Sequence, residues 1–161
     1  DEYYVHQFIN SNCDKVKIIT DFPNSSIVKI TADVSKLHIR IPAWCEKFDC
    51  NKPYTVEKGY AVITDTKGEI EINLNMVPVL MEANSLVADD AGRVALTYGP
   101  LVYCIEGVDH TEKLSQLYVN GDLKTTIQYD DLFGANVIIA DGFKKINSGL
   151  YTKYDKNNLC R

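Results

Sequence analysis

The sequence lacks the patterns that mark a membrane span, a common catalytic motif or a nucleic-acid-binding surface. No apolar run is long enough to cross a bilayer, and neither a P-loop, a dinucleotide-binding fingerprint nor G-x-S-x-G occurs. The net charge of −5 and the pI near 5.1 argue against nucleic acid or an anionic membrane as a partner. No window carries the apolar spacing of a true helix.

The cysteines also lack a metal-binding pattern, because none of them forms a C-x-x-C pair. Their number is odd, and they are Cys13, Cys45, Cys50, Cys104 and Cys160. Cys45 and Cys50 could bridge a short loop in an oxidising compartment. Reduced thiols are the better expectation, because the chain is far from disulfide-dense. Cys104 stands in an apolar run, so we expect it to be buried and inert.

The chain begins Asp1-Glu2-Tyr3, without an initiator Met and without the regions of a signal peptide. We therefore expect a fragment of a longer protein, with the compartment left open and the cytoplasm of a bacterium favoured. Its 161 residues are enough for one ordinary domain or two small ones. A hydrophobic share of 45% with 24% charged residues is typical of a globular chain.

Short strand patterns separated by turn residues fill the chain from end to end. They predict an all-β fold, an antiparallel, jelly-roll-like sandwich with little helix. Asn120-Gly121 is the strongest two-residue hairpin signal. The expected strands cover 3–9, 16–18, 27–31, 37–41, 60–64, 70–74, 77–81, 94–98, 101–105, 117–119, 127–129 and 137–140.

Gly92–Glu106 holds the clearest core signal in the middle of the chain. Its first run alternates, Leu101–Ile105 is continuously apolar, and Gly99-Pro100 bends the chain between them. The pattern predicts a strand, a bend and a second strand that is covered on both faces. A composition shift just before this stretch suggests a first sandwich over 1–88 and a smaller second one over 89–161, whose completeness stays open.

Reactive groups are scarce. His6, His38 and His110 lie on different segments, and we expect each to be a solvated imidazole. Glu69 and Glu71 share one face of a strand, so they cannot flank a sugar from the two walls of a cleft. We therefore assign no catalytic, cofactor-binding or metal-binding residue.

Aromatic residues are the remaining candidates for recognition, because exposed rings offer flat surfaces on which a sugar can stack. In small β proteins such rings are more often core or interface anchors. Trp44 follows Pro42 at a strand end, and Tyr3 and Tyr4 lie near the start of the chain. We therefore single out Trp44, Tyr3 and Tyr4 as contacts to a partner or a sugar. Tyr54 and Tyr60 complete the set of rings considered.

A resemblance rests on several segments in the same order. Leu37–Cys45 is similar to the L-x-x-R-I-P-A-W motif of glycoside hydrolase family 127, the β-L-arabinofuranosidase-like group (DUF1680). Glu57–Ile63, Met76–Asn84 and Gly92–Glu106 resemble the same family. Tyr4–Phe8 looks like the first strand after that family's catalytic barrel. These segments cover most of residues 3–106.

The resemblance implies a function without chemistry of its own. In that family an (α/α)6 barrel carries a cysteine nucleophile and a zinc ion held by cysteine and glutamate, and two β-sandwiches follow. The paired-cysteine motif of the barrel is absent here, so no such residue carries over and zinc is expected only in the barrel. We expect a non-catalytic accessory region that packs against the barrel of a parent glycosidase, with a homodimer through the barrel-facing surface as a further partner. The alternatives are a carbohydrate-binding module and an enzyme that uses a thiol.

Overall fold

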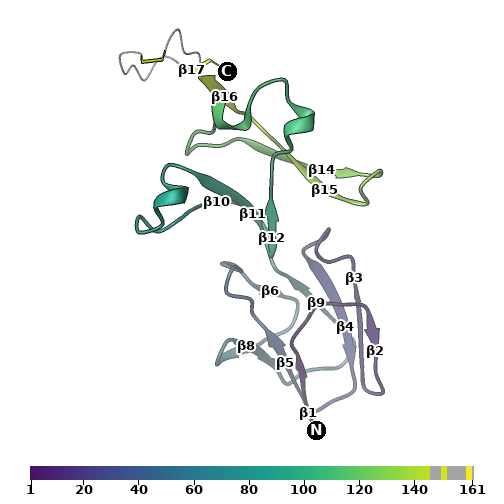
Figure 1. Cartoon of the computed structure of the whole chain (residues 1–161). Helices are drawn as coiled ribbons and strands as arrows, with labels where there is room; N and C mark the ends of the chain where they lie inside the picture. Colours follow the sequence, from purple (N-terminus) through teal and green to yellow (C-terminus); the bar gives the residue numbers. More distant parts are fainter. Residues whose placement is uncertain (146–149, 152–158, 161) are drawn as a thin grey trace. The chain divides into compact units, whose positions relative to one another are not determined.

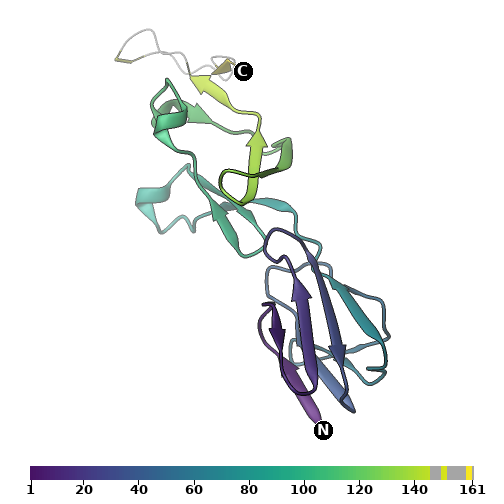
Figure 2. The same ribbon diagram turned by 90° about the vertical axis from the view of Figure 1, so that its right-hand side faces the viewer.

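Strands make up nearly all the regular structure of this chain in a computed structural model that describes residues 1–145, 150–151 and 159–160 (Figures 1 and 2). The helices in this part of the chain are single 3₁₀ turns, η1 (Ala88–Asp90), η2 (Gly107–Asp109) and η3 (Leu114–Gln116). The all-β prediction is confirmed. None of the described helices is long and apolar enough to cross a membrane.

The chain divides into two compact units. The first unit comprises Asp1–Val77 with Tyr98–Leu101, and the second comprises Pro78–Thr97 with Val102–Arg161. A compact unit does not always fold independently, so these units do not test the domain boundary that we place between 88 and 89. That boundary stays a prediction.

The first unit is a sandwich of two sheets. The four-stranded sheet has the order β1 (Glu2–Val5), β5 (Lys36–Arg40), β8 (Tyr60–Ile63), β7 (Thr55–Glu57). The five-stranded sheet has the order β2 (Ser11–Asn12), β3 (Val16–Thr20), β4 (Ile27–Ala32), β9 (Glu69–Asn73), β6 (Asp49–Cys50). All these pairs are antiparallel except β1 and β5, which run parallel at one edge of the four-stranded sheet.

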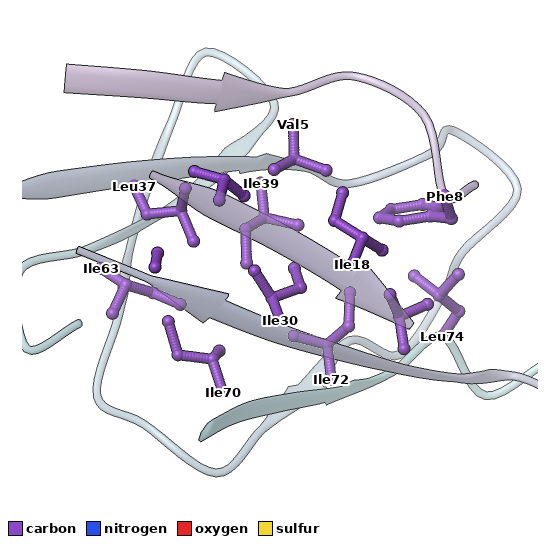
Figure 3. Close-up of a cluster of buried hydrophobic side chains, with 13 residues drawn as sticks. Val5, Phe8, Ile18, Ile30, Leu37, Ile39, Ile63, Ile70, Ile72 and Leu74 are labelled. Atoms are coloured by element: carbon purple, nitrogen blue, oxygen red, sulfur yellow. The ribbon is translucent and has the colours of Figure 1, made fainter. Parts of the chain in front are cut away.

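One apolar layer between the two sheets forms the core of this unit (Figure 3). In β4, Val28 and Ile30 are buried while Lys29 and Thr31 are exposed, as expected where one face of a strand meets the core. Each fully buried aliphatic side chain contributes roughly 1.5–3 kcal/mol. The fully buried side chains are Ile30, Leu37, Ile39, Ile63, Ile70, Ile72, Leu74 and Val28.

The second unit is built from three small sheets. They are β10 (Pro78–Glu82), β11 (Val94–Tyr98), β12 (Leu101–Tyr103); the hairpin of β14 (Thr125–Asp130) and β15 (Ala135–Ala140); and β13 (Leu117–Tyr118), β16 (Phe143–Lys145), β17 (Leu159–Cys160). The hydrophobic side chains that this unit contributes from the described residues are all half-buried or exposed. This unit therefore contains no packed core of its own within the described residues.

The central stretch forms the predicted strand, bend and strand, but its second strand is not covered on both faces. Val102 is 72% and Ile105 is 52% exposed, and Cys104 is exposed too. The prediction that Cys104 is buried is therefore wrong. A continuous apolar run is typical of a strand with other elements packed on both of its faces. β12 instead lies at the edge of a three-stranded sheet, and none of the described residues packs over it.

The hairpin predicted at Asn120-Gly121 is also wrong, because β13 does not pair with the strand that follows it. β13 pairs with β16, and β14 forms its hairpin with β15 instead. Asn120 Oδ1 accepts a hydrogen bond from the Gly121 N–H, which stabilises a local turn without joining two neighbouring strands.

Gly99 is required by both its backbone and its surroundings. Its φ of +56° lies in the left-handed region, and a Cβ placed on it would lie 2.3 Å from Met76 Sδ. Met76 is buried within the first unit, so its side chain has little room to move.

We predict that Gly99→Ala lowers the free energy of unfolding of the first unit by about 1–3 kcal/mol, because the new methyl group overpacks Met76. Urea denaturation measures the loss. Gly68→Ala is the matched control, since Gly68 has a φ of +78° with no atom within 4 Å of the added Cβ. An equal loss in both variants would show that backbone strain alone, and not the contact with Met76, sets the cost.

Candidate functional site

The outward face of the four-stranded sheet brings four rings together. Tyr4 on β1 pairs in register with His38 on β5, so the two side chains stand on the same face of the sheet. Tyr60 on β8 joins them from the other side, and His6 follows two residues after Tyr4. We call Tyr4, His6, His38 and Tyr60 the aromatic face.

The rings of the aromatic face contact one another closely. Tyr4 stacks on His38 with ring centroids 4.2 Å apart and planes 12° from parallel. Tyr60 meets Tyr4 edge-on at 5.6 Å and shares a 2.9 Å hydrogen bond between its hydroxyl and His6 Nδ1. The Tyr4 side chain stays 51% exposed, so a ring supported by its neighbours is open to solvent.

His38 is buried, which corrects the prediction that it is a solvated imidazole. Only 7% of the residue is exposed because the rings of Tyr4 and Tyr60 lie beside it. Its Nε2 makes no hydrogen bond with the described residues, although it lies 3.3 Å from Glu2 Oε2. The hydrogen bond and charge of Lys36, 2.8 Å away, lower the pKa of the Glu2 carboxyl.

Tyr3 and Tyr4 lie on different faces of the sheet, although they are adjacent in the sequence. Tyr3 pairs in register with Leu37, a core residue, and therefore stands on the opposite face of β1 from Tyr4. The aromatic face could be found in the sequence from the alternation of side chains along a strand. This alternation places Tyr4 and His6 on one face, and it places His38 on the other face of its strand from Leu37 and Ile39.

Trp44 lies in the loop after β5 and is half-buried against the core. It stacks on Phe22 at 6.3 Å and 11°, and Phe22 in turn meets Phe8 edge-on at 5.6 Å. Within residues 1–145, the Trp44 ring therefore packs at the end of the sandwich core and not against the aromatic face. Its assignment as a partner or sugar contact stays a prediction, as do those of Tyr3 and Tyr4.

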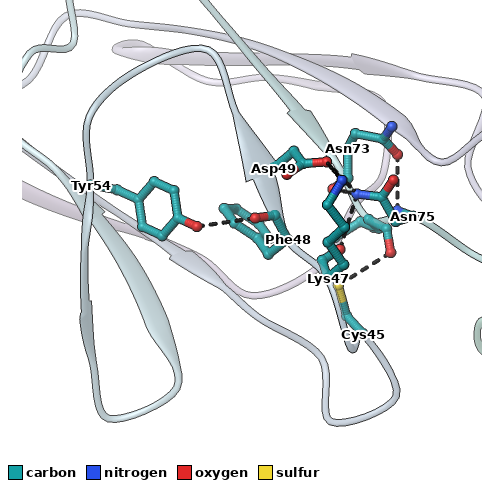
Figure 4. A network of polar contacts seen from close by, with 8 residues as sticks. Cys45, Lys47, Phe48, Asp49, Tyr54, Asn73 and Asn75 are labelled. Carbon is teal, nitrogen blue, oxygen red and sulfur yellow. Dashed lines mark hydrogen bonds and ion pairs between the residues drawn. The ribbon is translucent and has the colours of Figure 1, made fainter.

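A polar network holds the loop that follows Trp44 (Figure 4). The Cys45 thiol donates to the Leu74 carbonyl at 3.2 Å, and Asn75 Nδ2 donates to Lys47 O at 3.1 Å and Asp49 Oδ2 at 2.8 Å. Hydrogen bonds from Lys47 and Asn75 lower the pKa of the Asp49 carboxyl. The network fixes the loop to the end of β9 and satisfies its polar groups, which is a structural role.

Four of the cysteine thiols are described by the structure, and all four are free. Cys13, Cys45, Cys50 and Cys104 form no disulfide in the structure, and the expectation of reduced thiols stays a prediction. Burial raises the pKa of both Cys45 and Cys50, so less of the reactive thiolate is present at neutral pH. No group of three or more His, Cys, Asp or Glu side chains that could hold a metal ion occurs in the described part of the chain.

Comparison with known proteins decides the family. The model of the glycoside hydrolase family 127 C-terminal domain matches residues 60–140, just over half of the 161 residues. This chain belongs to that family. The resemblance to the C-terminal region of family 127 is thereby confirmed.

Individual relatives agree with this assignment. The chain is 31% identical over 157 residues to a non-reducing end β-L-arabinofuranosidase of Bifidobacterium longum, covering 84% of this chain and 22% of that protein. A GH127 β-L-arabinofuranosidase from Geobacillus stearothermophilus superposes with a TM-score of 0.75 at 27% identity, covering 97% of this chain and 28% of that one. A second solved GH127 β-arabinofuranosidase, at 23% identity, shares the fold with a TM-score of 0.72, covering 98% of this chain and 30% of that one.

The GH127 C-terminal chain described here thus spans about a quarter of the length of the relatives that it matches, between 22% and 30%. Those relatives are much larger proteins, and this chain corresponds to a minor part of each.

We predict that the four described thiols separate into two classes in a titration with a thiol-reactive dye at neutral pH. Cys13 and Cys104 react at once because they are exposed, while Cys45 and Cys50 react only after unfolding in urea. A Cys160→Ser background restricts the count to these four residues. Fast reaction of four thiols in the folded chain would contradict the burial of Cys45 and Cys50.

Proposed function

We propose that this chain is a non-catalytic β-sandwich region of a family 127 glycoside hydrolase, and that it packs against and supports the catalytic barrel of its parent protein. The parent would be a β-L-arabinofuranosidase or a related exo-glycosidase. This region needs no cofactor in the proposal, and a zinc ion would belong to the barrel.

The observation that carries the proposal is the uncovered apolar surface of the second unit. Large side chains such as Leu86, Val108 and Leu132 are 85–91% exposed. Exposed apolar surface on this scale marks a surface that another protein body covers. Relatives several times longer than this chain make the rest of the same polypeptide the natural cover.

The chemistry of the described residues supports a role without catalysis. Burial raises the pKa of the Cys45 and Cys50 thiols, and Cys45 donates to the Leu74 carbonyl. The carboxylates of Glu2, Asp49 and Asp65 are held in ion pairs with lysines. These groups stabilise the sandwich locally, and none of them forms a nucleophile–base pair.

We predict that the isolated chain does not hydrolyse a chromogenic β-L-arabinofuranoside, whereas the parent protein does. Removing this region from the parent should lower the melting temperature of the remaining catalytic part by at least about 2–4 °C, which corresponds to roughly 1 kcal/mol in a domain of 150–250 residues. Turnover by the isolated chain would contradict the non-catalytic assignment. An unchanged melting temperature of the catalytic part would contradict the supporting role.

A carbohydrate-binding module is the second candidate, and the aromatic face is the observation that favours it. The Tyr4 ring is exposed on a support of His38, an arrangement on which a sugar ring can stack.

Calorimetry separates the two functions. The supporting role predicts no saturable heat when arabinose-containing oligosaccharides are added to the chain. Saturable heat that disappears in Tyr4→Ala would favour the binding module instead. Tyr129→Ala is the matched control, because Tyr129 on β14 is also 51% exposed but lies in the second unit.

A further inference from the structure

The β14–β15 hairpin ends in a turn, Asp130–Gly134, that is held together by its own backbone and one carboxylate. Asp130 Oδ1 accepts hydrogen bonds from the N–H groups of Leu132 at 2.8 Å and Phe133 at 3.2 Å. The Gly134 N–H donates to the Asp130 carbonyl at 2.9 Å, and a φ of +63° at Gly134 lets the chain enter β15. The turn is therefore closed by local contacts.

This closed turn presents two large apolar side chains to solvent. Leu132 is 87% and Phe133 is 72% exposed. A pair of adjacent anchors on a backbone that is already ordered loses little conformational entropy on binding, which is what strong interface anchors require.

The apolar surface continues along the strand that leads to the turn. Ile127 and Tyr129 alternate on one face of β14 and are 38% and 51% exposed. Ile138 on β15 lies opposite Ile127 in register, so it belongs to the same face. Apolar side chains therefore also lie along the hairpin that leads to the turn, beside Asn136, which pairs with Tyr129.

The charge around the turn indicates what would cover it. Asp131 is exposed and forms no ion pair with the described residues, so its carboxylate is available to a cation. A second copy of this chain would carry another formal charge of −5 and would be repelled at long range. A body joined to the chain covalently meets the hairpin at a high effective concentration, and the relatives are three to four times longer than this chain.

We propose that Leu132 and Phe133 insert into an apolar pocket with a basic rim on the catalytic region of the parent protein. The hairpin turn is then the anchor that holds this region on the barrel. The proposal rests on the supporting role given above and specifies the contact through which that role is exerted.

Photocrosslinking in the complete parent protein tests the proposal. Benzoylphenylalanine replaces Phe133 in one variant and Lys58, in the exposed turn between β7 and β8, in the control. After irradiation and digestion, mass spectrometry is expected to join position 133 to a peptide of the catalytic region, while position 58 yields no such product. Products within this chain, products between two copies or no product at position 133 would each overturn the proposal.

A stability measurement separates the failure of this proposal from failure of the supporting role. In the parent protein, the double variant Leu132→Ser with Phe133→Ser should lower the melting temperature of the catalytic region, and Asp131→Lys should act in the same direction. Ile9→Ser is the control, because Ile9 is 59% exposed in the first unit, apart from the apolar surface of the second unit, and should leave that temperature unchanged.

Three results are distinguishable. If removing the whole region destabilises the catalytic part but the turn variants do not, the supporting role stands and the anchor is wrong. If Ile9→Ser acts as strongly as the turn variants, the anchor is wrong as well. If removal of the whole region has no effect, the supporting role itself is wrong.

Discussion

The structure depends on one apolar layer, in which two sheets bury aliphatic side chains against each other. Residues far apart in the chain, such as Val5, Ile30 and Ile72, meet in this layer. With roughly 1.5–3 kcal/mol for each buried side chain, the layer supplies the largest favourable contribution to the stability of the first unit. The loops at the ends of the sheets can then carry polar networks, such as that of Cys45 and Asn75, because the core already fixes the strands that they connect.

The second unit differs from the first in how its apolar side chains are packed. Its strands pair and its turns close, but the described residues provide no layer to cover its apolar side chains. A small body of this kind is stable when another surface completes its core. This contrast between a complete sandwich and an incomplete one is the physical basis of our proposal that the chain supports a larger parent protein.

Where one strand face met a core, the sequence was a good guide to the fold. The alternation of Val28 and Ile30 with Lys29, and of Leu37 and Ile39 with Arg40, predicted β4 and β5 and their inward faces. Prediction failed where the outcome depended on partners far along the chain. Cys104 is exposed because none of the described residues forms a layer over β12, and β13 pairs with β16 across more than twenty residues. The sequence pattern correctly placed His38 on the outward face of β5. It did not show that His38 is buried there, because side chains of the neighbouring strands cover it.

The parallel pairing of β1 with β5 has a consequence for synthesis on the ribosome. Glu2 pairs with Lys36, so the first strand leaves the ribosome well before its partner exists. At about 5–20 residues per second the delay is on the order of seconds, far longer than the time in which a hairpin closes. During that interval Tyr3, Tyr4 and Val5 form an unpaired apolar segment. The nascent chain is therefore open to chaperones at this point, and the completion of β5 sets the earliest moment at which β1 can pair.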